Sequence, residues 1–160
     1  MHPTITQYDH SDEGPIVQLS LRAWTPVHAS MKRVLGAELF EIIWPDWRKD
    51  QTKAVLDVLT DPSISVWVAA LEGVPIGFVA ATLHRDELAG TIVMLAVDPD
   101  HQRRGIGGAL TEHATDWLRS FGMRLAIVEA GGDPGHAPAR RTYEKANYTQ
   151  LPIARYFKAL

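Results

Sequence analysis

Apolar residues recur at helical spacing through most of the first 60 residues. After a short strand around Ile5, the pattern predicts a helix that starts near Asp12 and ends near Pro26. Its apolar stripe consists of Ile16, Leu19, Leu21 and Trp24. A second helical pattern covers residues 29–59 and is interrupted at Trp44-Pro45, because proline does not continue a helix. We therefore expect two helices there, with a kink between them.

Three apolar runs that favour strands follow, over residues 66–71, 76–83 and 91–97. Glu72-Gly73 separates the first two runs and is typical of a tight hairpin turn. A polar turn over residues 85–90 leads to the third run. The three runs predict an antiparallel meander.

A helix and a further strand are expected next. Residues 105–121 carry one apolar stripe, and Gly122 stands where a left-handed helix cap is needed. Leu125–Val128 is an uninterrupted apolar run, which is typical of a strand covered on both faces. The order strand, helix, strand predicts that this strand runs parallel to residues 91–97.

The last 25 residues predict a helix and a closing hairpin. Pro138 suits the first turn of a helix that ends near Asn147. Residues 148–151 and 153–158 resemble two short strands. The whole pattern is that of an α/β fold with a mixed sheet.

Composition narrows the function. The chain has 160 residues, 46% hydrophobic and 22% charged, without repeats, so we expect one domain over residues 1–160. A formal net charge of −3 favours neither nucleic acid nor a membrane surface as partner. There is no cysteine and no metal-binding spacing among the seven histidines, so neither a thiol nucleophile nor a metal is expected. The first 13 residues do not resemble a leader peptide, which predicts a cytoplasmic protein.

A basic, glycine-rich segment carries the most specific chemistry. Residues 95–108 read LAVDPDHQRRGIGG, which predicts a buried strand, a proline turn and a helix start. Free N–H groups and the dipole of a helix N-terminus bind anions, and glycines allow close approach. A plain helix turn with solvated arginines is the alternative, but the spacing and charge together favour a pyrophosphate site. The segment matches neither a Walker A loop nor the dinucleotide motif Gly-x-Gly-x-x-Gly.

Two segments resemble the GCN5-related N-acetyltransferase superfamily. QRRGIG at residues 102–107 is similar to the family's acetyl-CoA loop, Gln/Arg-x-x-Gly-x-Gly/Ala. HAPARRTYEKANY at residues 136–148 is similar to the family's Asn-x-x-Ala-x-x-Leu-Tyr-Glu-Lys-x-Gly-Phe. The resemblance covers roughly residues 91–148. It implies a mixed, mostly antiparallel twisted sheet of six to seven strands, with a central parallel pair splayed by a bulge and about four flanking helices.

The resemblance also implies an acetyl-CoA site made largely of backbone. A bulge at residues 95–97 would splay this strand from residues 124–129 and leave a gap for pantetheine. The amide of Leu95 would polarise the thioester carbonyl, Val97 would pair with the pantetheine, and the amides of residues 103–108 would hold the pyrophosphate. The cofactor-binding residues expected on this basis are Leu95, Ala96, Val97, Gln102, Arg103, Arg104, Gly105, Ile106, Gly107, Gly108, His136, Ala139 and Tyr143.

Tyr143 matches the family's general acid, which protonates the departing CoA thiolate. A phenol suits this role because it keeps its proton at neutral pH and can still transfer it. Packing on the sheet is the alternative.

Three positions depart from the family pattern: His136 stands for Asn, Thr142 for Leu and Asn147 for Gly. His136 could reach CoA, reach the acceptor or serve as a turn residue, whereas Asn147 still suits a left-handed cap.

The acceptor amine must lose a proton when it attacks, so a general base is expected. Glu129 follows the apolar run 125–128 beside the expected cleft, where burial would raise its pKa into a useful range. A carboxylate that faces solvent before Gly131-Gly132 is the alternative.

The sequence therefore predicts an acetyl-CoA-dependent N-acetyltransferase in which the amine attacks the thioester directly in a ternary complex. A small-molecule primary amine is the expected acceptor, with a protein N-terminus or lysine as the alternative. Pairs are frequent in the family, so a homodimer is a further expectation. A non-catalytic acyl-CoA-binding sensor is the rival from another class, and Tyr143 favours the enzyme.

Overall fold

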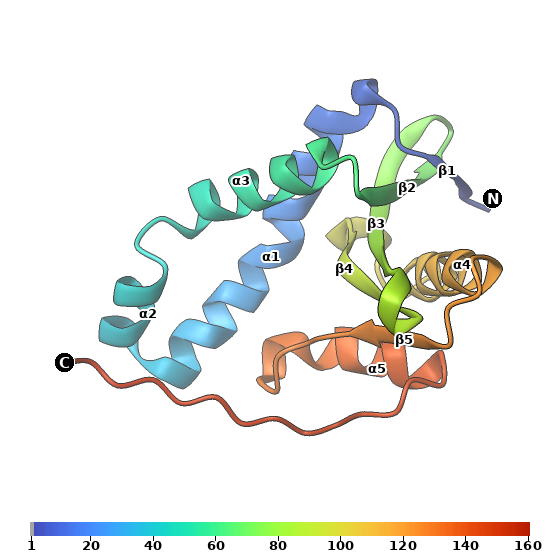
Figure 1. The fold of residues 1–160 in the computed structure, drawn as a ribbon. Helices are drawn as coiled ribbons and strands as arrows, with labels where there is room; N and C mark the ends of the chain where they lie inside the picture. The colour runs from blue at the N-terminus through green and yellow to red at the C-terminus, as the bar shows by residue number, and fades with distance from the viewer. Residues whose placement is uncertain (1) are drawn as a thin grey trace.

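The computed structural model describes residues 2–160 and contains one mixed sheet with helices on both faces (Figure 1). The strands, in their order across the sheet, are β1 (Thr4–Gln7), β2 (Ile64–Leu71), β3 (Val74–His84), β4 (Ala89–Val97) and β5 (Leu125–Val128). The helices are α1 (Glu13–Leu35), α2 (Ala37–Ile43), α3 (Trp47–Thr60), α4 (Ile106–Ser120) and α5 (Ala137–Lys145). Short 3-10 turns are η1 (His10–Asp12), η2 (Arg85–Glu87), η3 (Pro99–His101) and η4 (Pro134–His136).

The meander over β2, β3 and β4 is confirmed. All neighbouring strands are antiparallel except β5, which pairs with β4 in parallel. Glu72 and Gly73 form the β2–β3 turn with φ of 51° and 80°, because two-residue hairpin turns that match the strand twist need positive φ.

A β-bulge marks the point where β4 leaves β5. The β3–β4 register skips Val93, which lies between the paired residues Ile92 and Met94. The β4–β5 ladder stops at Ile92, so residues 93–97 have no neighbour on the β5 side. A bulge bends a strand and increases its twist, which accounts for the divergence. The bulge therefore lies two residues before the expected segment 95–97.

Side chains alternate between the two faces of the sheet and form two apolar layers. On β2, Val66 and Val68 pack with α1 and α3, whereas Trp67 and Ala69 pack with α4. The layer under α1 and α3 also holds Ile16, Leu19, Val55, Phe78, Ala80 and Ala96. The layer under α4 also holds Ile76, Val79, Ala81, Ile92, Ile106, Leu110 and Ala114.

The first helix is longer than expected, because α1 continues through Pro26 as far as Leu35. A proline removes one helical hydrogen bond, and the buried contacts of Ile16 and Leu19 before it and Ser30 after it compensate for that loss. The kink at Trp44-Pro45 is confirmed, since α2 ends at Ile43 and α3 begins at Trp47.

The expected six to seven strands are wrong, because the described chain has five. The parallel pair β4–β5 lies at one edge of the sheet and not in its centre. At this edge Leu125 is 57% exposed and Ile127 37% exposed, so β5 is not covered on both faces.

The missing strands are those of the predicted closing hairpin. Residues 146–160 form neither helix nor strand, and they run past α5 toward α2 (Figure 1). Only Pro152 separates the two expected strands, whereas a hairpin usually needs at least two residues in its loop. Phe157–Leu160 instead lie beside Leu39, Ile42 and Ile43 of α2, around a depression of about 370 Å³. No helix of residues 2–160 has the length and apolar character needed to cross a bilayer.

Candidate active site

The carboxyl ends of β4 and β5 lead into α4 and α5 through short turns, and these two helices contact each other. Diverging ends of parallel strands are a common place for ligands in α/β sheets. Leu95 and Val97 pack toward α4, while Ala96 is buried on the α1 side. This edge contains both motifs that the sequence singled out.

The segment before α4 forms an open loop. Arg103 and Gly105 have φ of 61° and 81°, and Gly105 is the N-cap of α4. The Gln102 side chain donates a hydrogen bond to the carbonyl oxygen of Val97 at 3.0 Å, which fixes the loop to the end of β4. The side chains of Arg103 and Arg104 are exposed, whereas Ile106 is buried beneath the helix.

The amides of residues 103–108 are free to bind a ligand. Within residues 2–160 no backbone or side-chain acceptor engages them, and the first helical bond runs from the Ala109 amide to Gly105. A Cβ at Gly105 or Gly108 would meet no atom within 4 Å, and one at Gly107 would lie 3.6 Å from Thr142. The loop therefore offers donors, positive charge and room to an anion.

Tyr143 lies on α5 near the end of the helix, which ends at Lys145 and is followed by Asn147 with the left-handed φ of 65° that the sequence predicted. Burial, followed by the influence of Tyr148, raises the pKa of Tyr143 to about 12. The two rings are 6.1 Å apart, and the Tyr148 hydroxyl is hydrogen-bonded to Thr115 of α4 at 2.7 Å. Tyr143 thus stays protonated over the whole neutral range.

Glu129 follows β5 directly, and its side chain is exposed. Of the two alternatives for this carboxylate, the structure shows the one that faces solvent. Ala139 is partly buried on the first turn of α5. His136 precedes that turn, and its Nδ1 is hydrogen-bonded to Asp133.

The structure adds residues that the sequence patterns did not single out. Ser30 of α1 donates a hydrogen bond to Asp133 at 2.6 Å, across 103 positions of sequence. His28 lies nearby and stacks on Trp47 at 4.3 Å between ring centroids. Burial, followed by the charges of His136 and Arg48, lowers the pKa of His28 to about 4. No local pattern reveals these contacts, because each joins α1 to a distant segment.

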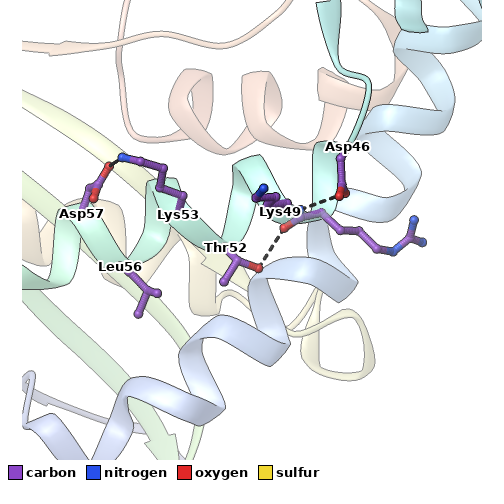
Figure 2. Close-up of a pocket in the computed structure, with 7 residues that line it drawn as sticks. Asp46, Lys49, Thr52, Lys53, Leu56 and Asp57 are labelled. Carbon is purple, nitrogen blue, oxygen red and sulfur yellow. Dashed lines mark hydrogen bonds and ion pairs between the residues drawn. The ribbon is translucent and has the colours of Figure 1, made fainter.

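A surface depression of about 640 Å³ lies elsewhere, along α3 (Figure 2). Its residues are mostly charged, and Lys53 and Asp57 form an ion pair across its rim at 2.6 Å. None of its lining residues belongs to the two motifs. The complete lining is Asp46, Arg48, Lys49, Thr52, Lys53, Leu56 and Asp57.

Comparison with protein families agrees with the two motifs. Residues 36–148 match the acetyltransferase (GNAT) family. Mycothiol acetyltransferase of Beutenbergia cavernae is 38% identical over 68 residues, which are 42% of this chain and 22% of that protein. The ribosomal protein bS18 alanine N-acetyltransferase of Escherichia coli is 36% identical over 67 residues, which are 42% of this chain and 44% of that protein. The matched part is therefore less than half the length of either relative.

Solved structures share the fold. The ribosomal-protein-S18-alanine N-acetyltransferase from Escherichia coli aligns with a TM-score of 0.67 and 21% identity, over 96% of this chain and 81% of that chain. The aminoglycoside acetyltransferase AAC(6')-Iy, in complex with a bisubstrate analogue of CoA and acetylneamine, aligns with a TM-score of 0.61 and 16% identity. That alignment covers 100% of this chain and 99% of the other.

Proposed function

The chain belongs to the GNAT acetyltransferase family, and on this basis we propose that it is an acetyl-CoA-dependent N-acetyltransferase. The acceptor amine and acetyl-CoA bind together, and the amine attacks the thioester directly. The absence of cysteine excludes a thioester intermediate on the protein itself.

The free amides of residues 103–108 are the observation that carries the proposal. They point to a diphosphate because they combine unpaired N–H groups, the N-terminus of α4 and two exposed arginines. Gln102 holds this loop to the end of β4, and Ile106 anchors it in the core. Leu95, Ala96 and Val97 would line the thioester end of the ligand, where β4 has left β5.

Tyr143 is proposed as the general acid. It keeps its proton at neutral pH, and its hydroxyl has no hydrogen-bond partner among residues 2–160. Thr115 is hydrogen-bonded to Tyr148, and the ring of Tyr148 lies beside that of Tyr143. A positioned phenol can therefore protonate the CoA thiolate as the carbon–sulfur bond breaks.

A small-molecule amine is the proposed acceptor. Relatives and structural neighbours include enzymes named for mycothiol and for aminoglycosides, which are small molecules. The bS18 alanine N-acetyltransferase supports a protein N-terminus as the second candidate. A cytoplasmic location and a homodimer stay predictions.

The test is release of free CoA thiol from acetyl-CoA with a panel of acceptors beside a control without acceptor. The panel contains neamine, a small amino sugar and a peptide with an N-terminal alanine. Release above the control identifies the enzyme and its acceptor class. Tight acetyl-CoA binding with no release across the panel would favour the sensor module instead.

A further inference from the structure

The turns after β4 and β5 share the pattern Asp-Pro-x-His. η3 and its cap read Asp98-Pro-Asp-His101, and η4 and its cap read Asp133-Pro-Gly-His136. Each aspartate accepts a hydrogen bond from the amide two residues later, at 2.9 Å for Asp98 and 3.0 Å for Asp133. The connection after each parallel strand therefore contains an aspartate followed three residues later by a histidine, directly after β4 and five residues beyond the end of β5.

Helix α1 contacts the two aspartates differently. Arg22 forms an ion pair with Asp98 at 2.5 Å and with Asp100 at 2.8 Å. Ser30 donates to Asp133 at 2.6 Å and accepts from the Gly135 amide at 2.8 Å. The arginine compensates the charge of Asp98, whereas an uncharged hydroxyl leaves the negative charge of Asp133 in place.

The two histidines differ as a consequence. His101 Nδ1 lies 3.6 Å from Asp98, beyond hydrogen-bond distance, and is buried without a partner. His136 Nδ1 donates to Asp133, whose side chain is only 11% exposed. Burial would raise the pKa of Asp133, but hydrogen bonds from Ser30 and His136 outweigh it, so the pKa is lowered.

The residues around Asp133 and His136 hold these two side chains in one orientation. A Cβ on Gly131 would lie 2.6 Å from His136 Nδ1, and a Cβ on Gly135 would lie 2.5 Å from that of Ser30, so both positions need glycine. Arg140 donates to the carbonyl oxygens of Gly131 and Asp133 and fixes the loop. The Nδ1 side of the imidazole is therefore enclosed.

The other nitrogen of His136 is accessible. Its Nε2 makes no hydrogen bond with any residue in the range 2–160, and this atom is not buried away from solvent. A carboxylate on Nδ1 keeps the proton there and leaves the lone pair on Nε2. Such an imidazole is arranged to accept a proton.

His136 is the N-cap of α5, and Tyr143 lies seven residues later on the same helix. Seven residues of helix rise about 10 Å, so the two backbone positions are separated by about that distance along the axis. The two side chains can therefore approach one bound thioester from different ends. One helix can thus present a proton acceptor and a proton donor to opposite ends of one reaction.

We propose that His136 is the general base, with Asp133 and Ser30 as positioning residues. The amine nitrogen bonds to the acyl carbon and its proton passes to His136 Nε2. The carbon–sulfur bond then breaks, and the thiolate takes the proton of Tyr143. The imidazolium and the phenolate afterwards exchange protons with solvent, which restores both groups.

The assignment rests on the proposed function and replaces Glu129 as the base. The charged and titratable groups near His136 are Asp133, which caps η4, Arg140 on α5 and His28 on α1. Arg48 and Asp50 of α3 act on His28. His28 is neutral above about pH 4 because burial and the neighbouring cations lower its pKa. Asp133 is therefore the only anion known to contact the imidazole within residues 2–160.

The first test needs no acceptor. Long-range nitrogen–proton NMR of the full chain, labelled with ¹⁵N-histidine and assigned with His136→Gln, reports the tautomer of His136. We expect the proton on Nδ1 in the wild type and a mixed tautomer in Asp133→Asn. A proton on Nε2 of the neutral wild-type imidazole would overturn the proposal.

The second test compares an amine that is mostly protonated at pH 7 with one that is mostly neutral. At saturating acetyl-CoA, His136→Gln should lower kcat about 100-fold for the amine identified by the acceptor panel, or for neamine, and flatten the acidic limb of the pH profile. Hydroxylamine is a weaker base, so its nitrogen gives up its proton more readily once it is bonded to the acyl carbon, and its turnover should fall less than that of the amine. Ser30→Ala should lower kcat a fewfold.

His101→Gln is the matched control, because it removes the histidine of the equivalent turn. The pH profile of kcat in this variant should match that of the wild type. Equal losses in His101→Gln and His136→Gln, or an equal loss with hydroxylamine, would overturn the assignment. Calorimetry should show that His136→Gln still binds acetyl-CoA, so that its loss of kcat is measured on the saturated enzyme. If the wild type itself did not bind acetyl-CoA, the proposed function would be rejected instead.

Discussion

Arg22 and Ser30 lie eight residues apart on α1, and each binds the aspartate that caps the turn after one of the two parallel strands. About 12 Å of helix separates the two positions, whereas neighbouring strands in a ladder are about 4.8 Å apart. One helix thus fixes the two diverging strand ends, and with them the starts of α4 and α5. The candidate site depends on this arrangement.

Arg22→Leu should destabilise the fold, because it leaves the carboxylate of Asp98, only 12% exposed, without its cation. We expect the free energy of unfolding to fall by more than the loss of an exposed ion pair, because Asp98 is mostly buried, although solvent around the half-exposed Arg22 limits the effect. Urea denaturation measures it, and Asp98→Asn in the same chain should recover part of the loss. Lys53→Ala, which breaks the exposed pair with Asp57, is the control and should cost less than about 0.5 kcal/mol. Equal costs for the two substitutions would contradict the role of Arg22.

Tyr143→Phe should reduce kcat at least 100-fold, because it removes the proton donor for the thiolate. Acetyl-CoA affinity should change less than threefold, since the phenol acts on the leaving group. In the wild type, the pKa of about 12 predicts that Tyr143 causes no fall in kcat up to pH 10. Tyr156→Phe, at a tyrosine that is 91% exposed, is the control. Unchanged turnover in Tyr143→Phe would remove the acid assignment.

Gly108→Val should weaken acetyl-CoA binding at least tenfold while the fold persists. A Cβ at this position meets no atom of the protein within 4 Å, so the added side chain extends into the open space that the diphosphate would need. Calorimetry gives the affinity, and thermal unfolding shows whether stability is kept. Gly132→Val also points into open space and should leave both values unchanged. An unaltered affinity in Gly108→Val would place the ligand elsewhere.

His28 should make the protein less stable in mild acid. The folded state keeps His28 neutral down to about pH 4, whereas the unfolded chain binds a proton below its ordinary pKa of about 6.5. Stability is therefore lost as the pH falls from about 6.5 to 4, by an amount on the order of 2 kcal/mol. His28→Leu should show a shallower decline in urea denaturation at pH 7, 5.5 and 4.5. His10→Gln, at an exposed histidine, is the control and should decline like the wild type. If His28→Leu also declined like the wild type, His28 would not contribute to the loss of stability in acid.

The sequence predicted the features that depend on neighbouring residues. The turn at Glu72-Gly73, the cap at Gly122 and the cap at Asn147 all have the expected positive φ, because these conformations are set by local sterics. The helix at residues 106–120 and the strand at residues 125–128 follow from local apolar patterns in the same way.

The features that it missed depend on distant contacts. The bond between Ser30 and Asp133 joins segments 103 residues apart, and the pair between Arg22 and Asp98 joins segments 76 apart. The repeated Asp-Pro-x-His was visible in the sequence, but only the contacts of α1 show that the two copies differ. For Glu129 the sequence left a buried and a solvent-facing carboxylate open, and the side chain is exposed because β5 lies at the edge of the sheet.

Titration calorimetry of the folded chain with acetyl-CoA tests the central claim most directly. The open amides of residues 103–108 predict saturable binding of one acetyl-CoA per chain, with the affinity reduced at least tenfold in Gly108→Val and unchanged in Gly132→Val. No detectable heat of binding with acetyl-CoA or CoA, from protein shown to be folded, would contradict the account.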